Sequence, residues 1–121
     1  MSYEAINFKE KFEKFDSYWT PKLITEMNDY QFKLMKMQGE LVWHRHEDTD
    51  ETYIVLKGNL TIMFRDGEVN LKEREMFVVP KGIEHNPISE EVCHVLLIEP
   101  AGVINTGADE NMLMSPQDNW I

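Results

Sequence analysis

The feature that most constrains the fold of this chain is a series of short apolar segments between residues 51 and 100. The segments contain many β-branched and aromatic residues, and each contains Gly, Pro or Asp-Gly as a turn signal. They read ETYIVLKG, NLTIMFRDGEVNL, EMFVVPKG and EVCHVLLIEP. Short segments separated by turn residues are typical of strands in a sandwich or barrel. The chain is therefore predicted to form an all-β, jelly-roll-like barrel.

Two of the turns contain residues that tolerate a positive φ angle, as tight hairpins require. They are Lys57-Gly58-Asn59 and Asp66-Gly67. Turns this short join neighbouring strands that run in opposite directions. Most strand connections are therefore expected to be antiparallel.

The residues before the barrel predict one short helix. Asn7 is followed three positions later by Glu10, which is the pattern of a helix start, and Phe8, Phe12 and Phe15 recur at helical spacing. The apolar stripe that results is expected to dock on its own domain.

A strand is expected to follow at Gln31 to Gln38, where Phe32, Leu34, Met35 and Met37 compete for the inward face. The 121 residues are expected to form one domain, because no linker, repeat or low-complexity tract divides them. Residues 1–30 are assigned to the helix and its lead-in, residues 31–100 to the barrel, and residues 101–121 to an irregular tail.

Composition argues against several classes of partner. The net charge of −10 repels nucleic acid and anionic lipid. No apolar run approaches the roughly 20 residues that span a bilayer, and no signal peptide is recognisable. The single cysteine, Cys93, excludes an internal disulfide. A protein of the reducing cytoplasm that binds neither membranes nor nucleic acid is expected.

Histidines provide the chemical signal. His44 and His46 are separated by one residue, so on a strand both side chains point the same way. Glu51 opens the next segment, and a third imidazole, His85, follows the Pro80-Lys81-Gly82 turn. Three neutral imidazoles and a carboxylate that converge inside a barrel suit a first-row divalent metal.

The spacing of these residues resembles the first motif of the cupin superfamily. That motif runs glycine, about five residues, His-x-His, three or four residues, glutamate, six residues, glycine. Here it corresponds to Gly39, His44-Arg45-His46, Glu51 and Gly58, with the first gap one residue short.

The second cupin motif contains Pro-x-Gly-x-x-His, which this chain carries at residues 80–85. Arg74 stands where that motif begins with glycine, and Ser89 stands where it ends with asparagine. These departures affect the geometry of a turn and one polar contact. The whole looks like the small single-domain cupins grouped with mannose-6-phosphate isomerase.

The resemblance implies a double-stranded β-helix barrel in which His44, His46, Glu51 and His85 bind the metal. Asp50 is the alternative to Glu51, but only Glu51 leaves six residues before Gly58. The ion could be zinc, iron, nickel or manganese, because His and carboxylate ligands suit all of them.

The fourth histidine, His94, lies in a segment with two apolar faces, so a core position or a hydrogen bond to a ligand is expected rather than metal binding. Cys93, on the opposite face, is expected to be a small buried side chain.

The expected function is binding of a small polar molecule, such as a sugar or an organic acid, at the metal, with isomerase or dioxygenase-type chemistry. The alternative is a non-catalytic module that binds a metal or a small molecule. A homodimer is expected by analogy with small cupins, with the Phe-rich helix and Trp120-Ile121 supplying apolar surface.

Overall fold

The computed structural model describes residues 2–102, 106–107 and 119–121. Within these residues a short helix, α1 (Phe8–Phe12), precedes nine strands. The strands are β1 (Lys22–Met27), β2 (Tyr30–Glu40), β3 (His44–Arg45), β4 (Glu51–Lys57), β5 (Leu60–Phe64), β6 (Gly67–Leu71), β7 (Met76–Val79), β8 (His85–Pro100) and β9 (Thr106–Gly107). The all-β prediction with one short N-terminal helix is confirmed.

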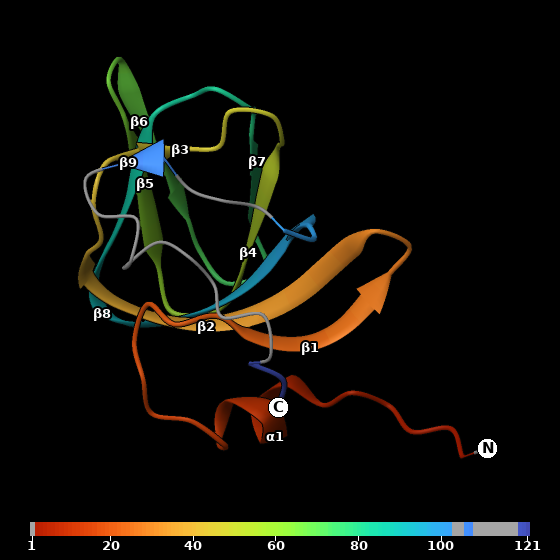
Figure 1. Cartoon of the computed structure of the whole chain (residues 1–121). Coiled ribbons are helices and arrows are strands. Elements are labelled where there is room, and N and C mark those ends of the chain that lie inside the picture. Colours follow the sequence, from red (N-terminus) through yellow and green to blue (C-terminus); the bar gives the residue numbers. More distant parts are fainter. Residues whose placement is uncertain (1, 103–105, 108–118) are drawn as a thin grey trace.

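The strands form a single curled sheet in which the pairs between named strands are antiparallel, as the turns predict. The long strand β8 holds it together. Its C-terminal half pairs with β2 on one side and β4 on the other, and its N-terminal half pairs with β5 and β3. In Figure 1, β1, β2 and β8 curve along the lower side of the barrel, and α1 lies below them.

Two apolar clusters lie on opposite faces of this sheet. The barrel interior is filled mainly by β4, β5 and β8, with Met35 and Met37 from β2. The outer face is covered by α1, whose Phe12 packs with Phe15 against Leu34 and Leu96. The competition among the apolar residues of β2 is therefore explained, because both faces of that strand are covered. The helix docks on its own domain as predicted, and Asn7 caps it by accepting a hydrogen bond from the Glu10 amide.

The structure adds one strand to the region predicted as a lead-in. β1 pairs with β2 across a two-residue turn at Asn28 and Asp29, and Asn28 has a φ of 56°. Asn is one of the residues that tolerate this conformation, so this turn could have been predicted from the sequence.

The prediction for Asp66-Gly67 is wrong in detail. The hairpin of β5 and β6 is present there, but neither residue has a positive φ, whereas Gly58 has a φ of 88°.

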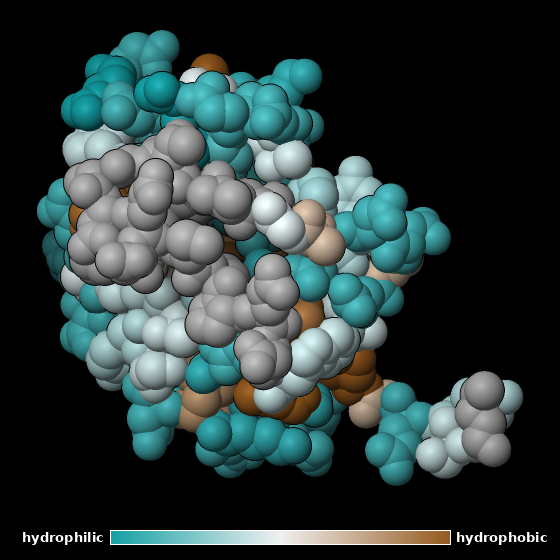
Figure 2. Space-filling model, viewed as in Figure 1, coloured by the Kyte–Doolittle hydropathy of each residue, from teal (hydrophilic) through white to brown (hydrophobic). Residues whose placement is uncertain are grey.

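The irregular tail predicted for residues 101–121 lies largely outside the described residues. Within it, β9 pairs with β3, and Ile121 packs against the outer cluster. Among the described residues, no helix is long and apolar enough to cross a membrane. Figure 2 shows that most of the visible face is hydrophilic, with brown apolar surface mainly in the lower part of the view, towards β1 and α1.

The turn before β7 contains Arg74, which stands where the second cupin motif begins with glycine. Arg74 has a φ of 72°, a left-handed conformation that a Cβ atom disfavours. Its amide donates to the Val55 carbonyl at 2.8 Å, and the Glu75 amide donates to the Lys72 carbonyl at 3.0 Å. The turn is thus held by backbone hydrogen bonds despite the strain at Arg74.

We expect Arg74→Gly to raise the free energy of unfolding by about 0.5–1 kcal/mol, because relief of left-handed strain outweighs the added flexibility of the unfolded chain. Urea denaturation measures the change. Arg74→Ala is the matched control, since it removes the same side chain but keeps Cβ, and it should give no gain. Equal effects of the two substitutions would contradict the role of the backbone.

Candidate metal centre

Three strands and one turn bring the candidate residues together at one end of the barrel interior. His44 on β3 is the direct partner of His85 at the start of β8. His46 follows β3, and its carbonyl accepts a hydrogen bond of 2.7 Å from the amide of Gly82, which has a φ of 77°. Glu51 begins β4 and shares its inward face with Tyr53 and Val55. The glycine turn therefore ties the segment of His46 to the approach of His85.

The four side chains form a compact buried cluster. The candidate ligand atoms of His44, His46, Glu51 and His85 all lie within 4.8 Å of one another. Each of the four residues is at most 5% exposed. Nε2 of His46 lies 2.9 Å from Oε1 of Glu51, and Nε2 of His85 lies 3.5 Å from the same oxygen. The structure therefore brings together all four residues that the sequence singled out, as a set that could hold a metal ion.

Backbone carbonyls fix the tautomers of two of the histidines. Nδ1 of His44 lies 2.9 Å from the Val42 carbonyl, and Nδ1 of His85 lies 2.9 Å from the Ile83 carbonyl. A carbonyl oxygen only accepts, so Nδ1 must carry the proton in both rings. In the neutral rings, Nε2 then carries the lone pair that binds metals.

One contact in the cluster is unfavourable without a cation. Nε2 of His85 is buried and has no hydrogen-bond partner among the described residues. Its lone pair faces the Glu51 carboxylate, so two acceptors oppose each other in a dry site, which is costly unless a positive charge lies between them. A divalent ion meets this requirement, and the donor set of three imidazoles and one carboxylate fits such an ion.

The electrostatics keep His44 neutral and Glu51 charged, which are the forms in which these two side chains bind metals. Burial, followed by the charge of His85, lowers the pKa of His44 to about 4, so its ring is neutral at pH 7. Burial alone would raise the pKa of Glu51, but the hydrogen bond and the charge of His46 oppose it and contribute to holding the pKa well below 4.5. Burial disfavours the His46 cation, yet Glu51 raises the pKa of His46 above 6.5. A carboxylate anion therefore lies at the centre of the cluster.

The residues beside the candidates point away from the cluster, as strand alternation predicts. Asp50 is exposed, and its Oδ1 accepts a hydrogen bond of 2.8 Å from the Lys81 amide. Arg45 pairs with Glu47, and Glu84 pairs with Arg65 at 2.7 Å. Among Asp50 and Glu51, only Glu51 faces the histidines.

His94 differs from its prediction. It lies neither in the core nor against a candidate ligand, but on the outer face of β8, where its ring stacks on Phe12 with the centroids 4.1 Å apart. Cys93, on the other face, is fully buried in the interior cluster as predicted, and burial raises its thiol pKa to about 12.

The sequence reasoning missed a buried ion pair beside the cluster. Lys33 on β2 and Glu99 on β8 are both buried, and Nζ of Lys33 lies 3.0 Å from Oε1 of Glu99. Oε2 of Glu99 has no hydrogen-bond partner among the described residues. Burial, followed by the negative charge of Glu51, raises the Glu99 pKa to about 7. The sequence could have indicated this position, because strand alternation places Lys33 on the same face of β2 as the core residues Met35 and Met37.

Tyr53 completes the interior around the candidate residues. Its side chain is buried, at 2% exposure. Its ring meets that of His85 edge-on, with centroids 6.1 Å apart. Burial and the charge of Glu51 raise the Tyr53 pKa well above 10, so its hydroxyl stays protonated.

The curled antiparallel barrel, together with three histidines and a glutamate at one end of its interior, defines a cupin. The chain belongs to the cupin domain family, whose pattern matches residues 32–99. The resemblance seen in the two motifs is thus confirmed.

Relatives agree with this assignment. "Uncharacterized protein YdbB" of Bacillus subtilis is 41% identical over 82 residues, which are 67% of this chain and 66% of that protein. The match therefore spans just under two thirds of that relative. A crystal structure of a cupin-2 domain containing protein from Shewanella frigidimarina is 55% identical, with a TM-score of 0.78, over 78% of this chain and 93% of that one. Protein NMB1881 from Neisseria meningitidis is 35% identical, with a TM-score of 0.74, over 81% and 100%.

Two more distant structures share the fold only. A hydroquinone 1,2-dioxygenase, PnpCD, solved with Cd2+ and 4-hydroxybenzonitrile, is 15% identical with a TM-score of 0.68, over 79% of this chain and 72% of that one. A sugar phosphate isomerase from Silicibacter pomeroyi is 16% identical with a TM-score of 0.58, over 69% and 59%. The same scaffold therefore accompanies different chemistries.

We expect Lys33→Met to lower the free energy of unfolding by about 3 kcal/mol, because it leaves the Glu99 carboxylate buried without its partner. The double variant Lys33→Met/Glu99→Leu should recover most of the loss, since an apolar pair needs no counter-charge. Urea denaturation in the presence of a chelator measures both. A double variant as unstable as the single one would show that the ion pair itself is required.

Proposed function

We propose that this chain is a metal-dependent cupin that binds a small polar molecule, a sugar or an organic acid, at an ion in the barrel interior. His44, His46, Glu51 and His85 would hold the ion. The observation that carries the proposal is the His85 lone pair, which is buried, is fixed in direction by the Ile83 carbonyl, lies opposite the Glu51 carboxylate and has no hydrogen-bond donor among the described residues. A cation is the species that satisfies both groups.

The neighbouring ion pair supports a polar ligand. Oε2 of Glu99 is a buried acceptor without a donor among the described residues, so a ligand hydroxyl could donate to it. Lys33 holds the other carboxylate oxygen, which fixes the direction of that acceptor. A hydroxylated molecule bound near the ion would therefore find an oriented acceptor in the neighbourhood of Glu51.

A divalent ion in this position would supply Lewis-acid polarisation of a carbonyl or hydroxyl group, or, as iron(II), reactivity towards dioxygen. The chain's own residues hold the rings of His44 and His85 in one tautomer, keep the Glu51 carboxylate charged and exclude bulk water. Isomerase and dioxygenase chemistry are both compatible with this arrangement, as is binding without turnover.

A panel of sugar phosphates, thiols and diketones with added iron(II) separates these cases. Turnover of any compound would show that the protein is an enzyme. Binding without turnover would show that it is a non-catalytic module.

We also propose that the protein acts in the cytoplasm and as a homodimer. The buried thiol of Cys93 suits a reducing compartment.

Part of the surface that the sequence offered for dimerisation is used within the protomer, because Phe12 and Phe15 are buried and Ile121 packs beside them. Trp120 remains exposed and could contact a second copy. A monomer mass by light scattering at micromolar concentration would reject the dimer.

We expect metal content per chain to separate ligands from neighbours. Alanine at a ligand position should reduce metal content sharply, because the set loses one donor of four. Alanine at a control position should leave metal content near wild type. The ligand variants are His44→Ala, His46→Ala, Glu51→Ala and His85→Ala, and the controls are Asp50→Ala and His94→Ala. Elemental analysis after identical purification is the measurement. Full metal content in both His44→Ala and His46→Ala would reject the metal centre.

Chelation should lower the melting temperature modestly, since a metal bound only by the folded state stabilises it by mass action. The shift should be modest because the barrel has a large apolar core of its own. Differential scanning fluorimetry with EDTA, followed by addition of each divalent ion in excess, measures the shift and ranks the metals. Complete unfolding on chelation would contradict this expectation, because it would show that the ion is required for folding rather than only for binding or catalysis.

A further inference from the structure

A row of basic side chains crosses the outer face of the sheet, away from the metal centre. His94 on β8 is the register partner of Lys36 on β2 and of Lys57 on β4. Like charges placed opposite one another on neighbouring strands destabilise a sheet. This row stands out in a chain whose net charge is −10.

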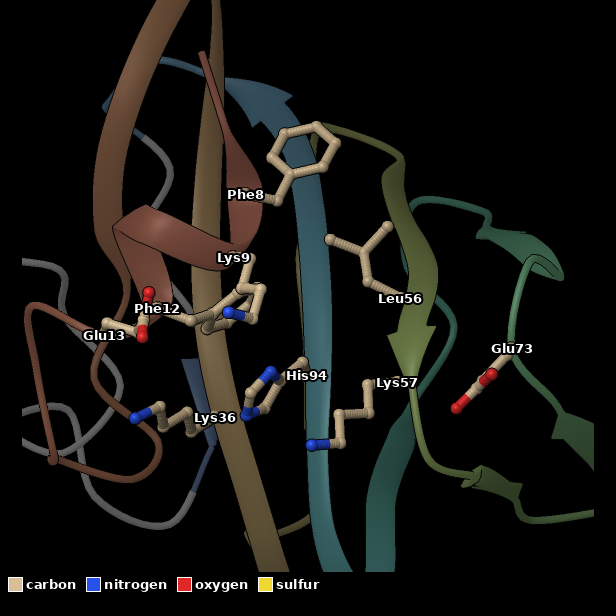
Figure 3. A pocket seen from close by; sticks show the side chains of 9 residues that line it. All are labelled: Phe8, Lys9, Phe12, Glu13, Lys36, Leu56, Lys57, Glu73 and His94. Atoms are coloured by element: carbon tan, nitrogen blue, oxygen red, sulfur yellow. The ribbon is translucent and has the colours of Figure 1, made fainter.

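The row forms part of a groove between α1 and the sheet, with a volume of about 650 Å³. A volume of this size lies within the range of roughly 300–1,000 Å³ that is usual for small-molecule sites. Figure 3 shows Lys36, His94 and Lys57 at one end of the groove and Phe8 and Leu56 at the other, with Lys9 of α1 between them. The groove therefore combines an apolar end with a cationic end.

The cations of the groove are poorly neutralised. Among the described residues, no carboxylate forms an ion pair with Lys9, Lys36 or Lys57. Nζ of Lys36 donates to the Phe15 carbonyl at 2.6 Å, so this lysine is held in place. The two acids of the lining are Glu13 and Glu73, and Glu73 accepts a hydrogen bond from the Gly58 amide at 3.2 Å.

The imidazole of His94 provides a polar edge in the middle of the row. Its face is covered by Phe12 in a stacked arrangement with an interplanar angle of 18°. Burial, followed by the charges of Lys36 and Lys57, lowers the His94 pKa below 6.5. A bound anion would oppose the lysine charges and favour the protonated ring, which could then donate a hydrogen bond to the anion.

We propose that this groove is a second binding site, which takes a small organic anion with a flat apolar body. The anionic group lies at the row of Lys36, His94 and Lys57, and the apolar body lies against Phe8, Phe12 and Leu56. The site is separate from the metal centre, because Lys36, Leu56 and His94 project from the face opposite Met35, Val55 and Cys93 of the interior. The proposal does not depend on the presence of a metal.

Two fluorescent probes with the same kind of aromatic body test the charge requirement. 8-Anilinonaphthalene-1-sulfonate carries an anionic group, and N-phenyl-1-naphthylamine does not. In Lys9→Gln/Lys57→Gln, the affinity for the anionic probe should fall about tenfold, which corresponds to about 1.4 kcal/mol. The affinity for the neutral probe should stay within about twofold. Lys36 is left intact because it also anchors the Phe15 carbonyl.

The matched control is Lys72→Gln/Lys81→Gln, which also removes two positive charges, from exposed turns outside the groove. Binding of both probes should be unchanged in this variant, and the anionic probe should shift the ring resonances of His94 in the wild type. Far-UV circular dichroism checks that each variant is folded. Unchanged affinity for the anionic probe in the double variant would overturn the proposal. Affinity that falls as protein concentration rises would also overturn it, because a second copy would then occupy the groove.

Discussion

The pairing of β8 with four other strands is the constraint on which the rest of the structure depends. At its start, His85 pairs with His44 on β3 and with Phe64 on β5. Further along, Val95 pairs with Met35 on β2 and with Val55 on β4. One continuous strand therefore sets the register of both halves of the barrel. A slip of one residue would exchange its two faces and place the interior side chains outside.

The interior of the barrel concentrates charge where apolar packing would suffice. Glu51, Glu99 and Lys33 are all at most 5% exposed, and each loses hydration when it is buried. The two carboxylates also repel each other, which is one reason why the Glu99 pKa rises to about 7. An apolar set of similar volume would be at least as stable. The presence of these buried charges agrees with the proposed metal centre, since a cation among the histidines would compensate part of the excess negative charge.

Local sequence spacing was sufficient to find the four candidate ligands, and it was insufficient for their surroundings. The six-residue spacing to Gly58 in the cupin motif selected Glu51 over Asp50, and alternation along a strand placed His44 and His46 on one face. Lys33 and Glu99 are 66 positions apart, so their pairing depends on the register of β2 with β8, which no local pattern encodes. His94 was misplaced for a similar reason. Its segment has two apolar faces, and only the docking of α1 shows that one of them lies outside the barrel.

The same alternation produces two faces of opposite character on one sheet. On β8, Cys93, Val95 and Glu99 face the interior, whereas His94 faces α1. Long lysine side chains at the outer face can extend their ammonium groups into water while their methylene groups cover apolar surface. Water and salt weaken the repulsion among them, so the basic row is tolerable outside the barrel, whereas the same row inside would require a counter-ion. Glu51 and the three imidazoles lie on the opposite face, inside the barrel, where water is excluded. In this position the carboxylate charge and the imidazole lone pairs would attract a divalent ion more strongly than they would in water.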